Sequence, residues 1–192
     1  MRGEGRVRVR IGYRHRQAFE LFHRRRARLA CVVAHRRAGK TVAAVCHLIH
    51  RALKNRRPAP RYGYIAPLLV QAKDVAWGYL KRYTAKIPGV VVREGELSVE
   101  LPNGARIRLY GADNPDRLRG LYFDGVVLDE FADFAPGAWT QVIRPTLSDR
   151  NGFAAFIGTP KGKNEFWRMY ERSKVEEGWY SLELKASTSK IL

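Results

Sequence analysis

The chain has 192 residues, 45% of them hydrophobic, which is enough for one well-buried core and argues against two full domains. Lys and Arg total 36 against 18 Asp and Glu, so the formal net charge is +18 and the isoelectric point lies near 10.5. This balance indicates a polyanionic partner, first of all nucleic acid, and it disfavours an acidic membrane surface because the arginines are not gathered beside an apolar segment.

The first part of the chain is its most basic part. Residues 1–28 hold ten arginines against two glutamates. Three apolar residues between positions 13 and 28 recur at helical spacing, which predicts a helix: Ala18, Leu21 and Phe22. We therefore expect residues 1–28 to form a basic arm followed by a helix, and residues 29–192 to form the core.

Strands and helices alternate through that core, which predicts an α/β fold with a mainly parallel sheet flanked by helices. The predicted strands are the apolar, β-branched runs at 29–34, 61–67, 123–130, 153–158 and 179–184. The predicted helices cover 41–53, 71–86 and 163–176. Residues 90–94 and 98–110 add antiparallel strands, with a hairpin at Pro102, Asn103 and Gly104, because Asn-Gly supplies the positive φ angles of a tight turn.

A phosphate-binding loop is predicted where the strand at 29–34 meets the helix after it. Gly39, Lys40 and Thr41 lie at this junction, where backbone N–H groups and a helix N-terminus face an anion. Lys40 would reach the β and γ phosphates of ATP, and the Thr41 hydroxyl would ligate Mg²⁺. The full Walker A pattern has a glycine at the position of Ala34, so a lysine-bearing turn that only resembles the motif is the alternative.

Two adjacent carboxylates end the apolar run before position 130. Asp129 would hold the Mg²⁺ through its water shell, as a Walker B aspartate does. Glu130 would orient and deprotonate the attacking water as a general base. A strand end that exposes two solvated acids is the plainer interpretation, but the order of loop and acids favours an ATPase.

Arginines near both motifs could stabilise the charge on the departing γ-phosphate. Arg36 and Arg37 lie inside the loop and could act in cis. Arg117 and Arg119 lie in a polar loop before the acidic strand, where a side chain could reach a neighbouring subunit or DNA.

Taken in order, these motifs resemble the large terminase subunit of tailed bacteriophages, the ATPase that drives viral DNA into the procapsid. HRRAGKT is similar to the family's deviant Walker A, which often lacks the first glycine and carries an arginine four residues before the lysine, here Arg36. RLRGLYFDGVVLDEFAD resembles the segment in which an Arg-Gly pair precedes the Walker B acids. The resemblance covers nearly the whole chain and implies a P-loop NTPase fold of the RecA-like (ASCE) kind.

The resemblance also assigns expected roles to single residues. It makes Arg119 a trans-acting arginine finger, although Arg117 lies two residues away and could substitute. It makes Gln17, in YRHRQAFEL, a reader of the adenine edge, and it adds the loop residues Arg37 and Ala38 to the nucleotide site. Thr159, in the GTP segment after a strand, matches the family's coupling residue, placed to sense the γ-phosphate.

The implied partners are double-stranded DNA, further copies of the chain in a ring, the portal protein and the small terminase subunit. No apolar run reaches the roughly 18 residues of a spanning helix, and the first residues lack a signal peptide's apolar segment. We therefore expect a soluble protein of the host bacterial cytoplasm, transiently at the procapsid portal. After Asp149 the sequence has no aspartate, so we expect the nuclease domain of the family, and nuclease activity, to be absent.

Two other functions share these motifs. A RecA-like helicase or translocase has the same loop and Asp-Glu strand, but it completes its site between two tandem cores, and only one fits here. A basic nucleic-acid-binding module that uses nucleotide as a switch would not need Glu130 as a base.

Overall fold

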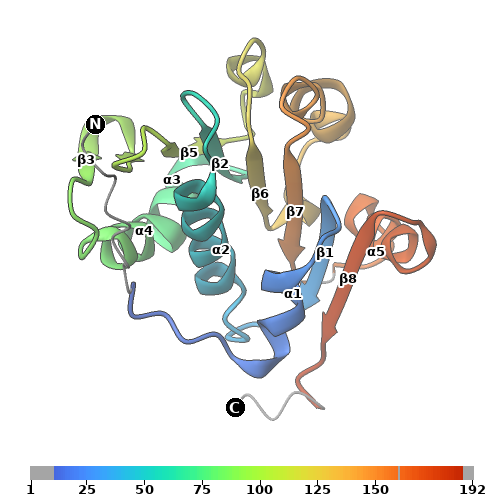
Figure 1. Cartoon of the computed structure of the whole chain (residues 1–192). Helices are drawn as coiled ribbons and strands as arrows, with labels where there is room; N and C mark the ends of the chain where they lie inside the picture. The colour runs from blue at the N-terminus through green and yellow to red at the C-terminus, as the bar shows by residue number, and fades with distance from the viewer. Residues whose placement is uncertain (1–10, 160, 188–192) are drawn as a thin grey trace.

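The structure is a computed structural model that describes residues 11–159 and 161–187. Eight strands form one sheet in the order β3-β4-β5-β2-β6-β7-β1-β8 (Figure 1). The strands are β1 (Leu29–Ala34), β2 (Arg61–Ala66), β3 (Val91–Arg93), β4 (Ser98–Glu100), β5 (Arg106–Gly111), β6 (Gly125–Asp129), β7 (Phe153–Gly158) and β8 (Trp179–Leu184). Residues 1–10 of the predicted basic arm and Pro160 of the GTP segment lie outside the described residues.

The sheet is parallel from β5 to β8, and β4 and β3 extend it by antiparallel pairing. The β4–β5 hairpin turns at Gly104, which has a φ of +78° and donates its N–H to the Leu101 carbonyl at 2.8 Å. The predicted mainly parallel sheet with an antiparallel addition is therefore confirmed.

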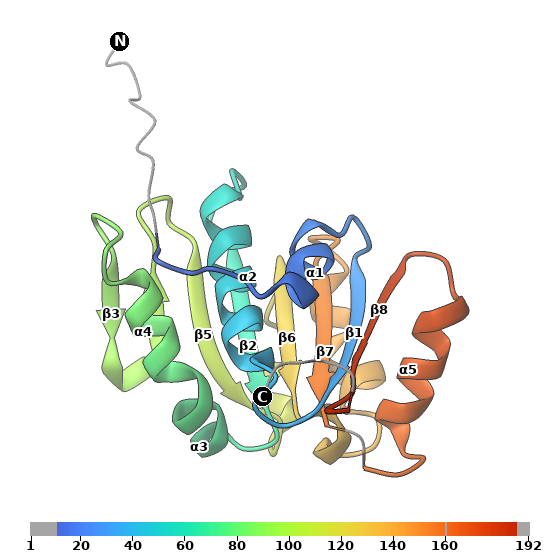
Figure 2. The ribbon, with the colours of Figure 1, turned by 90° about the horizontal axis from the view of Figure 1, so that it is seen from below.

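Helices cover both faces of the sheet, so its central strands are apolar on both sides, as parallel strands usually are. The helices are α1 (Glu20–Arg24), α2 (Lys40–Lys54), α3 (Leu69–Ala72), α4 (Gly78–Thr84) and α5 (Glu165–Val175). Figure 2 shows α1, α2 and α4 in front of the sheet, where they pack on alternate residues of β1, β2 and β7. The other face carries α5 and the segment 131–147. No helix in the described ranges is long and apolar enough to cross a membrane.

Two predicted elements differ in detail. The predicted helix at 71–86 is helical from α3 to α4, but a π-helical turn at Lys73–Trp77 joins the two. The first predicted helix is only a 3₁₀ turn, Gln17–Phe19, followed by α1. Phe19 and Phe22 are its buried residues, whereas Leu21 is 68% exposed, because two turns bury one narrow stripe against α2 and the sheet.

Candidate active site

A cleft of about 610 Å³ lies at the carboxyl edge of the parallel strands. The loop after β1, with the first turn of α2, forms one wall, and Glu130 at the end of β6 and the segment 74–79 contribute others. In an open α/β sheet this edge is where ligands bind, since loops and helix N-termini converge there. β7 lies between β1 and β6, so the lysine loop and the acidic strand flank the end of β7.

The loop between β1 and α2 turns sharply before Lys40. Arg37 has a φ of +65° and Gly39 one of +93°, both in the left-handed region, which glycine adopts without strain. This backbone lets α2 begin at Lys40 with its first N–H groups at the cleft, the arrangement that binds phosphate. Ala34 ends β1 as a buried strand residue, so the position needs no glycine here.

The Lys40 ammonium is buried among acceptors of the site. Its Nζ donates to the carbonyl oxygens of Ala34 at 3.0 Å and His35 at 3.4 Å, and to the Thr159 hydroxyl at 3.3 Å. Burial lowers the pKa of Lys40, while the carboxylates of Glu130 and Asp129 oppose that shift. The lysine predicted from the sequence therefore faces the predicted acids.

The two acids occupy different environments. Asp129 is 4% exposed, and it accepts hydrogen bonds from the Tyr64 hydroxyl and, at 2.9 Å, from the Glu130 N–H. Burial raises the pKa of Asp129 to about 6, the neighbouring Glu130 acts in the same direction, and the Tyr64 hydrogen bond opposes both. Glu130 adopts a left-handed conformation, with φ +47° and ψ +46°. Such strain is characteristic of functional positions, and it ends β6 at Asp129, one residue before the predicted bound.

Thr159, directly after β7, connects the lysine to the second acid. Its hydroxyl accepts from Lys40 Nζ at 3.3 Å, and its N–H donates to the Glu130 carboxylate at 3.4 Å. Thr159 therefore contacts both groups, and its coupling role stays a prediction.

The predicted arginines fall into two groups. Arg36 and Arg37 line the cleft and are exposed. The Arg119 side chain is 58% exposed, pairs with Asp116 at 2.6 Å and is not among the cleft residues. Arg117 is exposed in the same loop, and the trans-acting role of Arg119 stays a prediction.

Residues that sequence reasoning missed complete the cleft. The guanidinium of Arg16 donates to the carbonyl oxygens of Arg37 at 3.3 Å and Ala38 at 3.0 Å, and so holds the loop. Val75 and Tyr79, from the helical segment 73–84, add an apolar wall. No pattern in the sequence predicts that this segment lies beside the loop. Gln17 is exposed and is not among the cleft residues, so its adenine role stays a prediction.

A Mg²⁺ ion would need ligands beyond the protein. The described residues contain no group of three or more His, Cys, Asp or Glu side chains that could hold a metal. The Tyr64 hydroxyl, however, donates a hydrogen bond to Asp129, and Thr41 lies beside the same hydroxyl, so the two oxygen ligands lie near each other. One or two protein oxygens combined with substrate phosphates and waters are the usual Mg²⁺ environment, so these residues fit the ion.

Comparisons with known proteins point to one family, although no family model matches the chain. The chain is 30% identical to the terminase large subunit of Thermus phage G20c over 191 residues, covering 88% of this chain and 39% of that protein. It is 32% identical to that of Escherichia phage T5 over 147 residues, covering 73% and 32%. The chain therefore spans about two fifths or less of the length of these relatives.

Solved structures agree with this match. The large terminase ATPase domain of Thermus phage P74-26 superposes with a TM-score of 0.77 at 26% identity, covering 91% of this chain and 82% of that one. The large terminase of another thermophilic bacteriophage, in complex with ATP-gamma-S, superposes with a TM-score of 0.63 at 15% identity, covering 86% and 41%. The second comparison shows the shared fold.

Proposed function

We propose that this chain, a homologue of phage terminase large subunits over the region of their ATPase domain, hydrolyses ATP to drive double-stranded DNA into a procapsid. One observation carries the enzymatic part: Thr159 joins Lys40 to Glu130 at the carboxyl edge of the sheet, beside Asp129. The matched relatives and the net charge of +18 support the DNA part, since so basic a surface suits a polyanion.

The loop and Lys40 would bind the triphosphate. Lys40 exchanges the Ala34 and His35 carbonyls for phosphate oxygens, while the N-terminus of α2 presents N–H groups to the same anion. Phosphate oxygens are charged and the carbonyls are not, so the exchange favours the nucleotide. Arg16 keeps the loop in place because it bonds the backbone of Arg37 and Ala38.

Glu130 would activate the water that attacks the γ-phosphate. The Thr159 N–H holds the Glu130 carboxylate next to Lys40. In this position the carboxylate would accept a proton from the water. When the γ-phosphate leaves, Lys40 and Thr159 lose a shared partner, which gives β7 a way to report the state of the nucleotide. Bound at Thr41 and Asp129, Mg²⁺ would neutralise phosphate charge.

The positive charge that stabilises the transition state would come from arginines of two subunits. Arg36 lines the cleft of its own chain, whereas Arg119 lies on the surface with Asp116 as its partner. We infer a homo-oligomeric ring in which Arg119 of one copy enters the cleft of the next. We further propose the portal protein and the small terminase subunit as partners and the host bacterial cytoplasm as the location, and the similarity to terminase large subunits supports this.

Replacing Glu130 with Gln tests the enzymatic assignment. Loss of a general base typically lowers turnover by about 10² to 10⁴, while ATP affinity should stay within a few-fold because the loop and Lys40 are intact. Turnover is measured by phosphate release and affinity by titration with a fluorescent ATP analogue. Glu177→Gln, an exposed glutamate outside the cleft, is the matched control. Unchanged turnover in Glu130→Gln would refute the assignment.

A further inference from the structure

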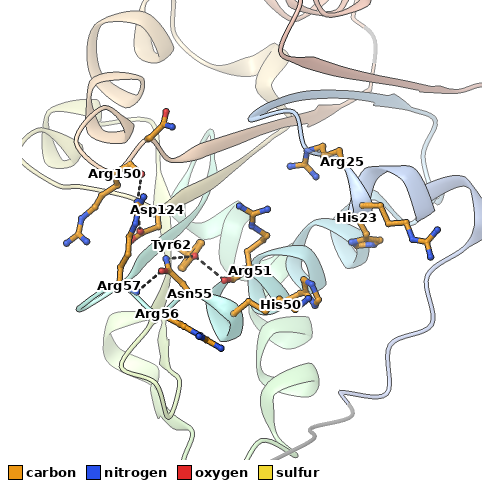
Figure 3. A pocket seen from close by; sticks show the side chains of 13 residues that line it. His23, Arg25, His50, Arg51, Asn55, Arg56, Arg57, Tyr62, Asp124 and Arg150 are labelled. Carbon is orange, nitrogen blue, oxygen red and sulfur yellow. Dashed lines mark hydrogen bonds and ion pairs between the residues drawn. The ribbon is translucent and has the colours of Figure 1, made fainter. Parts of the chain in front are cut away.

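A second cavity, of about 710 Å³, lies at the opposite edge of the sheet (Figure 3). The ends of α1 and α2 and the loops before β2, β6 and β7 surround it. Because these are the amino ends of parallel strands, the cavity is separated from the nucleotide cleft by the length of the strands. The mechanism proposed for ATP hydrolysis uses none of its residues.

The cavity is cationic with almost no compensating acid. Seven of its 13 lining side chains are Lys or Arg, and Asp124 is its one carboxylate. Asp124 is itself engaged, since one of its oxygens accepts from the Arg61 N–H at 2.9 Å and the other lies 3.6 Å from Arg57. One acid cannot neutralise seven cations, so the cavity is suited to an anion from outside the chain.

The position of Arg25 supports this conclusion. One of its terminal nitrogens donates to the Phe22 carbonyl at 2.6 Å, and its guanidinium lies 4.3 Å from the centre of the Phe22 ring. Its Nε is buried without a hydrogen-bond partner. Burial lowers the pKa of Arg25 to about 9, and the nearby Arg51 adds to this. Arg25 is half-buried, and a buried donor atom without a partner is costly unless an acceptor comes to it.

Arg51 has no acidic partner among the residues that the structure describes. Its guanidinium lies 5.2 Å from the centre of the Phe153 ring. Lys54 and Arg56 are exposed, and neither forms an ion pair within the described ranges. These side chains can accept a ligand without first breaking a salt bridge.

The cationic surface is larger than one phosphate requires. A smaller cavity, of about 200 Å³, adjoins the cavity of about 710 Å³. It shares Arg25, Arg51 and Asn151 with the larger cavity and adds Arg26 and Arg28. We call the two joined cavities the basic trough. Two adjoining cavities lined by arginines match successive phosphates along a chain better than one free anion, because each can take a phosphate of its own.

We propose that the basic trough binds the phosphate backbone of DNA. This inference rests on the proposed function, which it deepens by assigning a contact surface for the DNA. Arg and Lys side chains with neighbouring amides, here Asn55 and Asn151, are typical groups that position a protein on phosphates without reading sequence.

Helix α2 connects the trough to the nucleotide cleft. It begins at Lys40 in the cleft and ends at Lys54 in the trough, and its 15 residues span roughly 22 Å at 1.5 Å per residue. Because this distance separates the two sites, substitutions in the trough should alter DNA affinity and leave the ATPase rate without DNA unchanged.

The test compares two double variants that remove equal charge from exposed sites. Lys54→Gln/Arg56→Gln removes two cations of the trough, whereas Arg144→Gln/Arg168→Gln removes two exposed arginines that line neither of its cavities. Binding of a fluorescent duplex is measured by anisotropy over a range of salt concentrations, together with ATPase rate and melting temperature.

We expect the trough variant to bind DNA about 30-fold more weakly at 0.15 M salt, since each released phosphate contact is worth about 5-fold there. Its plot of log affinity against log salt should be flatter by about 1.8. The control should bind within about 2-fold to 3-fold of the wild type, because its arginines make no such contact. Both variants should keep the wild-type ATPase rate without DNA.

The other outcomes refute the inference in distinguishable ways. Equal weakening by both pairs would overturn the trough and leave the ATPase proposal standing, and absence of wild-type DNA binding would remove the DNA part of both. Inorganic phosphate, added at the ionic strength of a sodium chloride control, tests for a small-anion site. If the trough variant loses phosphate binding but binds DNA as the wild type does, the trough is a site for free anions. Binding to anionic phospholipid vesicles but not to DNA would assign it to lipid headgroups.

Discussion

The two edges of the sheet hold their cations in different ways. In the cleft, Lys40 has three acceptors from its own chain, and Glu130 and Asp129 lie beside it. In the basic trough, Arg25 keeps an unused donor and Asp124 is the one carboxylate of the larger cavity. The cleft is thus preorganised for one defined ligand, whereas the trough keeps an excess of charge that suits an extended anion.

The largest effect is expected where the cleft is incomplete. If Arg119 acts in trans, Arg119→Ala and Glu130→Gln should each be nearly inactive in the assembled ring, since a trans arginine is worth about 10³ to 10⁵ in rate. Mixed in equal amounts, the two variants should recover about a quarter of the wild-type rate, because that share of interfaces joins an intact Glu130 to an intact Arg119. Phosphate release with DNA present measures this.

Two further substitutions identify the arginine. Arg36→Ala mixed with Glu130→Gln should not recover activity if Arg36 acts within its own cleft, because Arg36 and Glu130 line the same cleft. Arg117→Ala, mixed with Glu130→Gln in the same way, tests whether Arg117 takes the role assigned to Arg119. Failure of the Arg119→Ala and Glu130→Gln mixture to recover activity, combined with a large loss in Arg36→Ala, would place the finger in cis.

Removing one hydroxyl at each edge sharpens the comparison. Tyr64→Phe removes the hydroxyl that donates a hydrogen bond to Asp129, and loss of such a supporting partner typically costs about 10-fold to 100-fold in metal affinity or activity. Tyr62→Phe, on the same strand, removes a hydroxyl that donates to the Arg51 carbonyl at the other edge. ATPase rates titrated with Mg²⁺ should fall only in Tyr64→Phe, and equal losses would contradict the assignment.

Sequence reasoning found the groups that a local pattern positions. A strand, a glycine-bearing loop and a helix fix where Lys40 and Thr41 lie, and the apolar strand before Asp129 fixes the acids. Tyr64 escaped notice because its hydroxyl matters only once β2 and β6 are adjacent, and that pairing brings together Tyr64 and Asp129, which are 65 residues apart in the sequence. The sequence did not say which side of the first helix is buried, for the same reason: packing partners distant in sequence bury Phe19 and Phe22 and leave Leu21 exposed.

Arg16 was also missed, and its removal should have a moderate effect. Arg16→Ala takes away two hydrogen bonds to the loop carbonyls of Arg37 and Ala38. Because Arg16 is exposed, we expect the KM for ATP to rise by about 10-fold with kcat little changed, the pattern of lost uniform binding. Arg14→Ala, an exposed neighbour, is the control in steady-state kinetics. A fall in kcat with unchanged KM would instead give Arg16 a role in the transition state.

The smallest expected effect is on the pH dependence of the free energy of unfolding, through a histidine at the trough edge of the sheet. His47, which lines the smaller cavity of the trough, is buried. Burial, followed by the charges of Arg25, His23, Arg51 and His50, keeps its pKa well below the usual value. The unfolded chain therefore binds a proton below about pH 6.5 that the folded chain refuses, so the free energy of unfolding falls as pH falls.

Between pH 7.5 and 5.5 this single group should lower the free energy of unfolding by roughly 1 kcal/mol. His47→Gln stays neutral and should lose that much less than the wild type in urea unfolding at the two pH values. His23, whose pKa burial lowers to about 4, remains in both proteins and cancels in the difference. If the wild type and His47→Gln lose the same free energy of unfolding, His47 is protonated in the folded protein. Its surroundings would then be less cationic than we propose for the trough.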